Sequence, residues 1–273
     1  MKKSLLVTSI TLALTLCIST SSFASTNNSE ELKPFNYNNV IETYFSSVPD
    51  YVKDINLNVE VTNDKNYLTD EEVSKVTIES LIEINEKIKS EHILNKHTEN
   101  EANKIVAELI KDSISKNKNN VSDYEIPGWD SLNDAEKDLA TSHPIEFTKY
   151  ATTANAASNL AQAYYGESQL YQGNGDAFRH SYWNAMLVQE LGNDPLHGTQ
   201  RAQVWTDAHE ATSSGIDKRM DLINNESGRY HAYLNFDDTR QQLSDAIKTQ
   251  VSQGGKVRIV NNQLVATNGV TGK

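Results

Sequence analysis

Apolar residues recur at helical spacing along most of the chain beyond residue 68. Two capping boxes, Thr69-x-x-Glu72 and Thr98-x-x-Glu101, each precede a run of apolar side chains spaced three or four positions apart. These runs predict two amphipathic helices within residues 68–115. The polar segment 115–120 has no periodicity and predicts a linker, so residues 25–120 form a smaller N-terminal helical region.

The helical pattern continues through residues 121–273, which we assign to one C-terminal domain. Asn133-x-x-Glu136 caps a short helix, and Pro144 begins a longer one that ends near Gly166. The remaining helices are predicted over the ranges 175–191, 199–213, 216–233 and 238–251. The expected fold class is therefore mainly α, with a multi-helix, bundle-like C-terminal domain.

Two places favour strands instead. Residues 55–61 alternate strictly between apolar and polar side chains, which predicts a half-buried strand. Residues 256–260 and 263–267 flank Asn261-Asn262 and predict a small C-terminal β-hairpin around a tight turn. This hairpin offers a pairing partner for the strand at 55–61.

The first 24 residues have the pattern of a secretory signal peptide. Lys2 and Lys3 precede an apolar run from Leu5 to Ile18, and Ser22-Phe-Ala24 resembles a signal peptidase site. The run is interrupted by hydroxyl residues and is shorter than the roughly 20 residues that span a bilayer. We expect a secreted extracellular or cell-envelope protein that has no transmembrane segment after cleavage.

Charge and cysteine content narrow the possible functions. The formal net charge is −12, which argues against direct binding to nucleic acids or to anionic membranes. The only cysteine, Cys17, lies inside the predicted leader. Disulfides, thiol catalysis and cysteine-bound zinc are therefore not expected in the mature chain.

Three polar clusters within the predicted helices carry the candidate chemistry. Asp176, His180 and Asn184 are spaced four apart and share a helix face, with Arg179 beside them. In the second cluster, Asp207 and Glu210 share a face, whereas His209 points elsewhere together with Trp205. In the third cluster one polar face carries Asp221, Asn224, Asn225 and Gly228, with Asp217 one turn upstream and Arg229 next in sequence.

Imidazole nitrogens and carboxylate oxygens around one cavity are what a divalent cation requires, and zinc, manganese, magnesium and calcium all fit this chemistry. We assign His209, Glu210 and Asp221 as metal ligands. The catalytic set is His180, Asp176, Arg179 and Asn184, and the binding set is Asn224, Asn225 and Arg229. Without a metal, His180 could act as a general base that activates water or Ser181.

Structural interpretations exist for the same residues. Asp176 and His180 can form a helix cap and an intrahelical pair, and the face of Asp221 and Asn225 can be solvated. The large apolar side chains near the clusters favour core packing; these are Phe178, Trp183, Trp205 and Met220.

The ordered motifs Asp176-Ala-Phe-Arg-His-x-x-Trp-Asn184, His209-Glu210 and Met220-Asp-x-x-Asn-Asn-x-x-Gly-Arg229 resemble an uncharacterised domain family of bacterial secreted and phage proteins. The resemblance covers about residues 126–235. It implies a helical domain with one polar site formed by these side chains. A looser likeness to bacterial phospholipases A2 departs at Ser181, where those enzymes have Asp directly after the histidine.

Three functions follow as expectations. The first is a metal-assisted hydrolase of an ester or phosphoester, whose substrate is extracellular. The second is a non-catalytic extracellular binding or cell-surface protein whose polar cluster is a buried network that specifies helix packing. The third is a secreted toxin domain, with residues 25–115 as a delivery or pro-segment.

Overall fold

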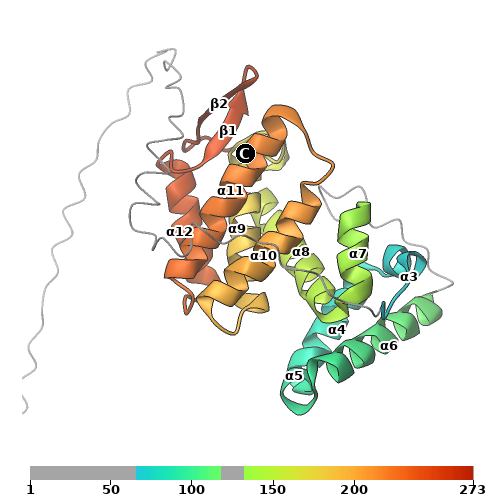
Figure 1. Cartoon of the computed structure of the whole chain (residues 1–273). Coiled ribbons are helices and arrows are strands. Elements are labelled where there is room, and N and C mark those ends of the chain that lie inside the picture. The colour runs from blue at the N-terminus through green and yellow to red at the C-terminus, as the bar shows by residue number, and fades with distance from the viewer. Residues whose placement is uncertain (1–65, 118–131, 273) are drawn as a thin grey trace, which may run out of the picture. The chain divides into compact units, whose positions relative to one another are not determined.

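The structure, a computed structural model, describes residues 66–117 and 132–272. Within these two ranges the chain forms ten α-helices, one short 3₁₀ helix and a two-stranded antiparallel hairpin (Figure 1). The predicted mainly helical fold with a small C-terminal hairpin is confirmed. The predicted leader 1–24 and the predicted strand 55–61 lie outside the described residues.

The N-terminal helices are α3 (Asp70–Lys75), α4 (Ile78–Ser90), α5 (Ile93–Lys96) and α6 (Glu99–Asn117). The expectation of two helices here is wrong, because the region forms four, and two of the breaks between them were not predicted. Val76 is extended, and Thr77 begins a new helix by accepting a hydrogen bond from the amide of Ser80. His92, directly before α5, takes a left-handed conformation with φ of 54°.

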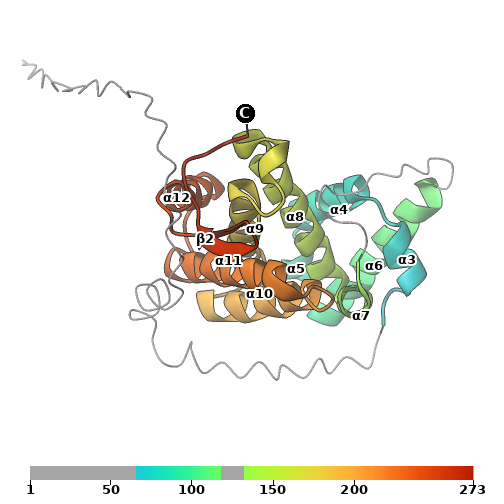
Figure 2. The ribbon, with the colours of Figure 1, turned by 90° about the horizontal axis from the view of Figure 1, so that it is seen from above.

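The C-terminal helices build the domain that carries the polar clusters. In chain order these elements are α7 (Asp134–Ser142), α8 (Pro144–Tyr165), η1 (Glu167–Gln169), α9 (Asn174–Leu191), α10 (Pro195–His209), α11 (Gly215–Leu234) and α12 (Arg240–Ser252). Helix α9 packs against α8, α10, α11 and α12, and it lies between them in both views (Figure 1, Figure 2). The side chains of α9 are accordingly buried on almost every face.

Helix α10 differs from its predicted bounds at both ends. It begins at Pro195, because the side chain of Asp194 accepts from the amide of His197 and caps the first turn. It ends at His209, so Glu210 is the C-cap and not a residue of the helical face. Asp207 and Glu210 therefore do not share a face as predicted: Asp207 is exposed, and Glu210 is buried.

The strands β1 (Val257–Val260) and β2 (Gln263–Ala266) pair antiparallel, with Val260 opposite Gln263. Asn261 and Asn262 between the strands have φ values of 52° and 59°. A two-residue hairpin turn of type I′ requires positive φ at both positions. Strand β1 packs against α11 and α9.

Aromatic side chains fill the core around α9, as predicted. Phe178, Trp183 and Trp205 are each at most 1% exposed, and Met220, which is also 1% exposed, packs in a smaller cluster with Val257 and Ile259. Tyr150 lies between the two indoles, with ring centroids 5.0 Å from Trp183 and 4.6 Å from Trp205. Among the described residues, no helix has the length and apolar character that a membrane crossing requires.

Candidate functional site

Helix α9 supplies the first two side chains of the site. Asp176 lies in the first turn, where a carboxylate is stabilised by the positive end of the helix dipole. Its Oδ2 atom accepts a hydrogen bond of 2.7 Å from the amide of Gln172. Gln172 itself takes a left-handed conformation, with φ of 57°, directly before the helix. His180 follows one turn after Asp176 and is 3% exposed.

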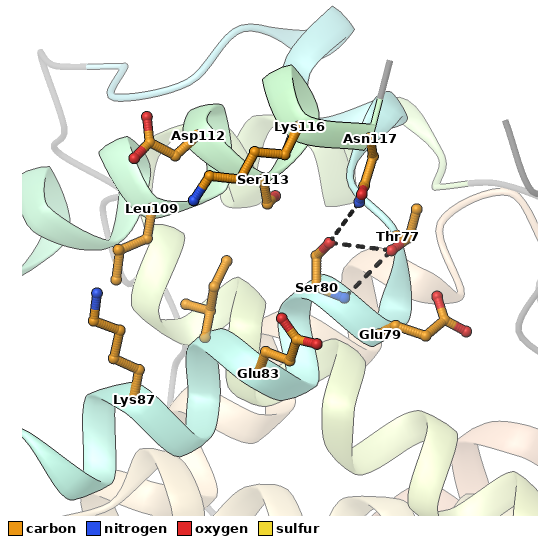
Figure 3. A pocket seen from close by; sticks show the side chains of 11 residues that line it. Thr77, Glu79, Ser80, Glu83, Lys87, Leu109, Asp112, Ser113, Lys116 and Asn117 are labelled. Atoms are coloured by element: carbon orange, nitrogen blue, oxygen red, sulfur yellow. Dashed lines mark hydrogen bonds between the residues drawn. The ribbon is translucent and has the colours of Figure 1, made fainter. Parts of the chain in front are cut away.

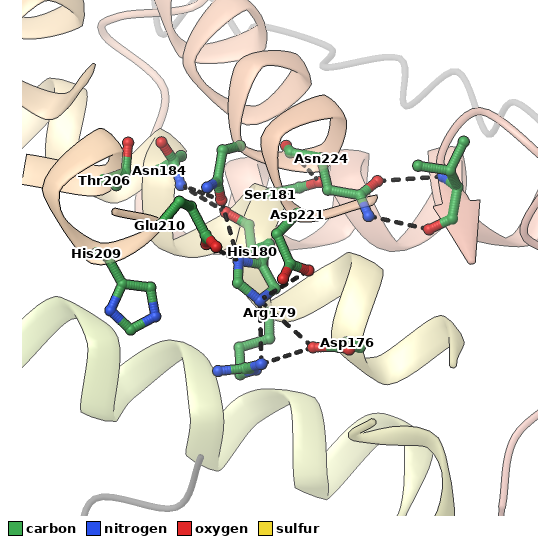
Figure 4. A network of polar contacts seen from close by, with 12 residues as sticks. Asp176, Arg179, His180, Ser181, Asn184, Thr206, His209, Glu210, Asp221 and Asn224 are labelled. Carbon is green, nitrogen blue, oxygen red and sulfur yellow. Dashed lines mark hydrogen bonds and ion pairs between the residues drawn. The ribbon is translucent and has the colours of Figure 1, made fainter. Parts of the chain in front are cut away.

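Acids of two other elements also approach His180, namely Asp221 of α11 and Glu210 at the C-cap of α10 (Figure 4). Its Nε2 atom lies 3.3 Å from Oδ1 of Asp221 on α11 and 3.5 Å from Oδ1 of Asp176. Its Nδ1 atom lies 4.0 Å from Oε1 of Glu210. Asp176, His180 and Asp221 offer three ligand atoms that all lie within 4.8 Å of one another, a grouping that can hold a metal ion.

A chain of hydrogen bonds fixes which nitrogen of His180 carries the proton. Arg229, which can only donate, donates from Nη1 to Oδ1 of Asn184 and to Oγ1 of Thr206, both at 2.8 Å. The amide nitrogen of Asn184 then donates to Oδ1 of Asn225 at 2.7 Å. Nδ1 of His180 lies 3.1 Å from that same acceptor oxygen, so it must be the donor. The lone pair of Nε2 therefore faces the two aspartates.

The charges of the site are unbalanced. Asp176, Glu210 and Asp221 surround His180, whereas Arg179 is the basic side chain that pairs with them, through a 2.6 Å hydrogen bond from Nη2 to Oδ1 of Asp176. The same Nη2 atom lies 3.0 Å from Nε2 of His180. The guanidinium therefore points into the group of acceptors, in a position that a cation would also favour.

Burial and these neighbours shift the pKa values in a consistent direction. Burial, then the positive charges of Arg179 and His209, lower the pKa of His180 well below its usual range, so the imidazole is neutral. Burial, then the negative charges of Asp176 and Glu210, raise the pKa of Asp221 to about 9. Burial opposes the charge of Arg179, but Asp176 outweighs it and the pKa of the guanidinium is raised.

Several buried polar atoms of the site lack a partner. Among the described residues, no hydrogen bond reaches Oε1 of Glu210, Nε of Arg179 or Nδ2 of Asn225. Buried polar atoms are normally paired in native proteins, so these three atoms are the ones that a ligand or an ordered water would satisfy. The expectation that the polar face of α11 is solvated fails here, because Asn225 is 0% exposed.

The structure separates some predicted site residues from this centre. Asn224 turns toward the hairpin, where its side chain donates to the carbonyl of Val257 and accepts from its amide. Ser181 donates to the backbone carbonyl of Asn224 at 3.0 Å, so its hydroxyl holds α9 to α11. Gly228 makes this close crossing possible, since an added Cβ would lie 2.1 Å from the carbonyl oxygen of Ser181.

His209 does not join Asp176, His180 and Asp221. Its Nδ1 atom lies 2.9 Å from Oε1 of Glu136 on α7, which also accepts from the hydroxyl of Tyr150 at 2.6 Å. The predicted ligand set of His209, Glu210 and Asp221 therefore shares only Asp221 with the group that the structure brings together. Sequence reasoning identified Glu136 only as a capping residue. A glutamate that caps a helix with one carboxylate oxygen keeps the other oxygen for a second partner. This property of Glu136 is the sequence signal that could have indicated a contact with His209.

Two cavities of the described part of the chain lie away from this site. One, of about 350 Å³, lies between α4 and α6, and hydrogen bonds join Thr77, Ser80 and Asn117 at one end of it (Figure 3). The other, of about 480 Å³, lies between α7 and α10. The polar site reaches solvent instead through Asp221 and Arg179, whose side chains are 17% and 14% exposed.

Comparison with known proteins finds one family model that matches part of the chain. No curated protein and no solved structure matches the chain. The grouping of Asp176, His180 and Asp221, together with Glu210 and Arg229, lies in one stretch of sequence. That stretch, residues 137–255, matches the family described as a domain of unknown function, DUF6973.

Proposed function

We propose that the C-terminal domain binds one divalent cation through Asp176, His180 and Asp221 and acts as a metal-assisted hydrolase of an ester or phosphoester. The observation that carries the proposal is the convergence of three ligand atoms, one imidazole nitrogen and two carboxyl oxygens, which all lie within 4.8 Å of one another. In the cation-free protein Arg179 and the proton on Asp221 offset the negative charge at this place, and a divalent cation would replace both of them.

The chemistry of the ligands narrows the choice of cation. An imidazole with two carboxylates suits zinc or manganese better than calcium, which prefers oxygen ligands alone. The imidazole is also oriented as a ligand requires, because Asn225 accepts from Nδ1 and leaves Nε2 for the metal. Three protein ligands leave coordination positions for water and substrate.

Arg179 would change partners when the cation binds. Its Nη2 atom contacts both Asp176 and His180, so it must turn away to admit the ion. Once displaced, the guanidinium lies beside the site and can bind an anionic ester oxygen. The cation would activate a bound water for attack on the ester, and Arg179 would stabilise the negative charge that develops.

The test measures cation binding first. Chelator-treated protein is titrated with Zn²⁺, Mn²⁺ and Ca²⁺ by calorimetry, beside Asp176→Asn, Asp221→Asn and the control Asp217→Asn. Asp217 lies one turn before Asp221 on α11 but accepts from Gln172. We expect the two ligand variants to lose more than the roughly 10- to 100-fold in affinity that an outer-shell partner costs, and the control to bind normally.

Activity is then assayed with 4-nitrophenyl esters and bis(4-nitrophenyl) phosphate at saturating cation. Hydrolysis that depends on the cation and disappears in Asp176→Asn supports the proposal. Absence of cation binding at millimolar concentration, with no shift in melting temperature, refutes it.

A second candidate is the non-catalytic binding protein with a buried polar network. The observation that favours it is the chain of hydrogen bonds from Arg229 through Asn184 to Asn225, in which both amides are 0% exposed. Such a network stabilises one helix packing without any ligand. Secretion is proposed from the leader pattern of residues 1–24, and the toxin alternative from residues 25–115 as a delivery or pro-segment. Expression of the full chain and its detection outside the cells tests the export that both require.

A further inference from the structure

Glu210 differs from the other acids around His180. It is 1% exposed, and no hydrogen bond within the described residues reaches its Oε1 atom. That atom lies 4.0 Å from Nδ1 of His180, which is longer than a hydrogen bond (Figure 4). Asp176 and Asp221, in contrast, approach the other nitrogen of the ring, Nε2. A buried carboxylate oxygen without a donor is costly, so its presence in the core requires a reason.

The local structure makes this position of Glu210 less favourable still. Glu210 is the C-cap of α10, where the negative end of the helix dipole disfavours a carboxylate. The side chain of Asn133 nevertheless fixes this end of the helix, because it donates to the carbonyls of Ala208 and His209 at 2.8 and 3.1 Å. The fold thus holds Glu210 beside His180 against the local preference, and such conflicts are expected at functional sites.

Nδ1 of His180 has a partner in the cation-free protein, but this partner has a better donor. Nδ1 lies 3.1 Å from Oδ1 of Asn225, and the amide of Asn184 donates to the same oxygen at the shorter distance of 2.7 Å. That oxygen would keep the donor from Asn184 if His180 left it. A move of the Nδ1–H group to Glu210 would therefore leave Asn225 paired and supply the donor that Oε1 of Glu210 lacks.

A cation on Nε2 changes which acceptor the imidazole prefers. A divalent metal withdraws electrons from the ring, so the Nδ1–H group becomes a stronger donor. A hydrogen bond to a carboxylate is roughly twice as strong as one between neutral groups. Metal-bound histidines accordingly often donate their second N–H to a carboxylate, which raises the basicity of the ligand. The neutral amide of Asn225 suits the cation-free ring, and the charged Glu210 suits the loaded ring.

We propose that Glu210 is a positioning residue of the cation site: when a divalent cation binds Nε2 of His180, the Nδ1–H group moves from Asn225 to Oε1 of Glu210. This inference rests on the proposed function and reassigns Glu210, which the sequence predicts as a metal ligand. A charge-assisted hydrogen bond of this kind is about 2.8 Å long, so the two atoms must approach each other by roughly 1 Å. A change in the side-chain torsions of Glu210 can supply that distance.

The geometry separates this role from that of a ligand. A metal bound to Nε2 of His180 lies about 2.1 Å beyond that atom. Within the described residues, the ligand atoms that lie within 4.8 Å of one another come from Asp176, His180 and Asp221. Glu210 approaches the ring at Nδ1 instead. It therefore acts on the cation through the imidazole.

The first measurement follows the proton of His180. Full-length, chelator-treated protein with isotope-labelled histidine is titrated with Zn²⁺, and the Nδ1–H signal is observed by NMR; a His180→Asn sample, which lacks the signal, assigns it. We expect the proton to move downfield as Zn²⁺ binds, and to move much less in Glu210→Gln, because a hydrogen bond to a carboxylate is shorter than one to an amide. An equal movement in the two proteins would mean that the metal alone causes it, and would overturn the inference.

The second measurement is the Kd of Zn²⁺ by calorimetry. Glu210→Gln keeps the shape and an oxygen acceptor but loses the charge, and we expect a Kd that is weaker by roughly 10- to 100-fold. Without the cation this variant should melt no lower than the wild type, because it removes the charge from a buried oxygen that has no donor. A purely structural role predicts the reverse: a lower melting temperature and an unchanged Kd.

The matched control is Glu146→Gln. Glu146 is also a carboxylate that contacts α10, because it accepts from Arg201 at 2.9 Å and from the indole of Trp205 at 2.8 Å. Its loss should lower the melting temperature and leave both the Kd of Zn²⁺ and the movement of the His180 proton unchanged.

Each result decides the question. An unchanged Kd in Glu210→Gln overturns the inference while the proposed cation site stands. Complete loss of binding, as in Asp221→Asn, would show that Glu210 is a ligand. A weaker Kd with an unchanged proton signal would assign Glu210 to Arg179, whose Nε atom also lacks a partner among the described residues.

Failure of the wild type to bind any cation refutes the proposed function, and the role of Glu210 with it. Cation binding without hydrolysis refutes only the proposed activity. If Glu210→Gln does not fold, Glu210→Asp keeps the charge but withdraws the oxygen by one methylene group, and it gives the same readouts.

Discussion

The substitution Asp221→Asn tests the charge imbalance of the site directly. In the cation-free protein burial and the negative charges of Asp176 and Glu210 raise the pKa of Asp221 from 3.8 to about 9. The folded protein therefore keeps this proton between about pH 4 and pH 9, whereas the unfolded chain has lost it. Because the folded state binds more protons in this window, the contribution of Asp221 to stability falls as the pH rises.

The magnitude follows from the size of that shift. Between pH 3.8 and pH 7 the free energy of unfolding falls by about 1.4 kcal/mol per pH unit because the unfolded chain releases the proton. An Asp221 that titrates independently would therefore lower the free energy of unfolding by about 4 kcal/mol at pH 7. The charges of Asp176 and Glu210 are coupled to the titration of Asp221, so we expect a loss of about 2 to 4 kcal/mol in the free energy of unfolding. Asparagine resembles the protonated acid in shape and does not titrate. Asp221→Asn should therefore be more stable than the wild type at pH 7 by about this amount, and equally stable near pH 4.

The assay is urea unfolding of chelator-treated protein at several pH values from 4 to 8, beside Asp217→Asn, which removes the charge that adds least to the raised pKa of Asp221 and should give a smaller gain. A gain for Asp221→Asn that grows with pH supports the electrostatic account. A difference that does not change with pH, or a variant less stable than the wild type at pH 8, would refute it. Saturating Mn²⁺ or Zn²⁺ should then stabilise the wild type, by about 2.7 kcal/mol at 100 times Kd, and leave Asp221→Asn unchanged.

Three further variants test the remaining parts of the site. Arg179→Met removes the guanidinium that competes for Asp176, so calorimetry should show a cation Kd that is at least several-fold tighter. Activity assays should show a lower rate with the phosphodiester. A weaker cation Kd would contradict this prediction. Arg229→Met frees the amide of Asn184 and with it the tautomer of His180, and it should weaken cation binding by roughly 10- to 100-fold, whereas an unchanged Kd would remove the hydrogen-bond chain from the argument. Gly228→Ala places a methyl group 2.1 Å from the Ser181 carbonyl and should cost roughly 2 kcal/mol or more of unfolding free energy in urea titrations; a wild-type value would mean that α9 and α11 can separate at no cost.

The local sequence predicted much of the fold because its signals are local. Capping boxes, Pro144 and the Asn261-Asn262 turn satisfy backbone groups within a few residues, so they are readable without tertiary information. The sequence predicts one helix too few where a capping residue lies inside an apolar run. Thr77 satisfies the amide of Ser80 and restarts the helix there, although the apolar spacing continues across the break.

Spacing along the chain also predicts which side chains share a face of one helix. Asp176 and His180 are four residues apart on α9, and their contact is a consequence of helix geometry alone. It could not determine that Asp221 completes the group, because that contact depends on how α9 and α11 cross. The crossing is set by Gly228, which lets the backbone of Ser181 approach and places α11 beside His180.

The partner of His209 is known only from the packing of α7 against α10. On the sequence it is one of two histidines near acids, and either could be a ligand. The fold brings α7 against α10, and Glu136, 73 residues away in sequence, accepts a hydrogen bond from Nδ1 of His209. Side-chain contacts across helices depend on packing of the whole core, which no short-range pattern encodes, and this is why the partners of these histidines had to be read from the structure.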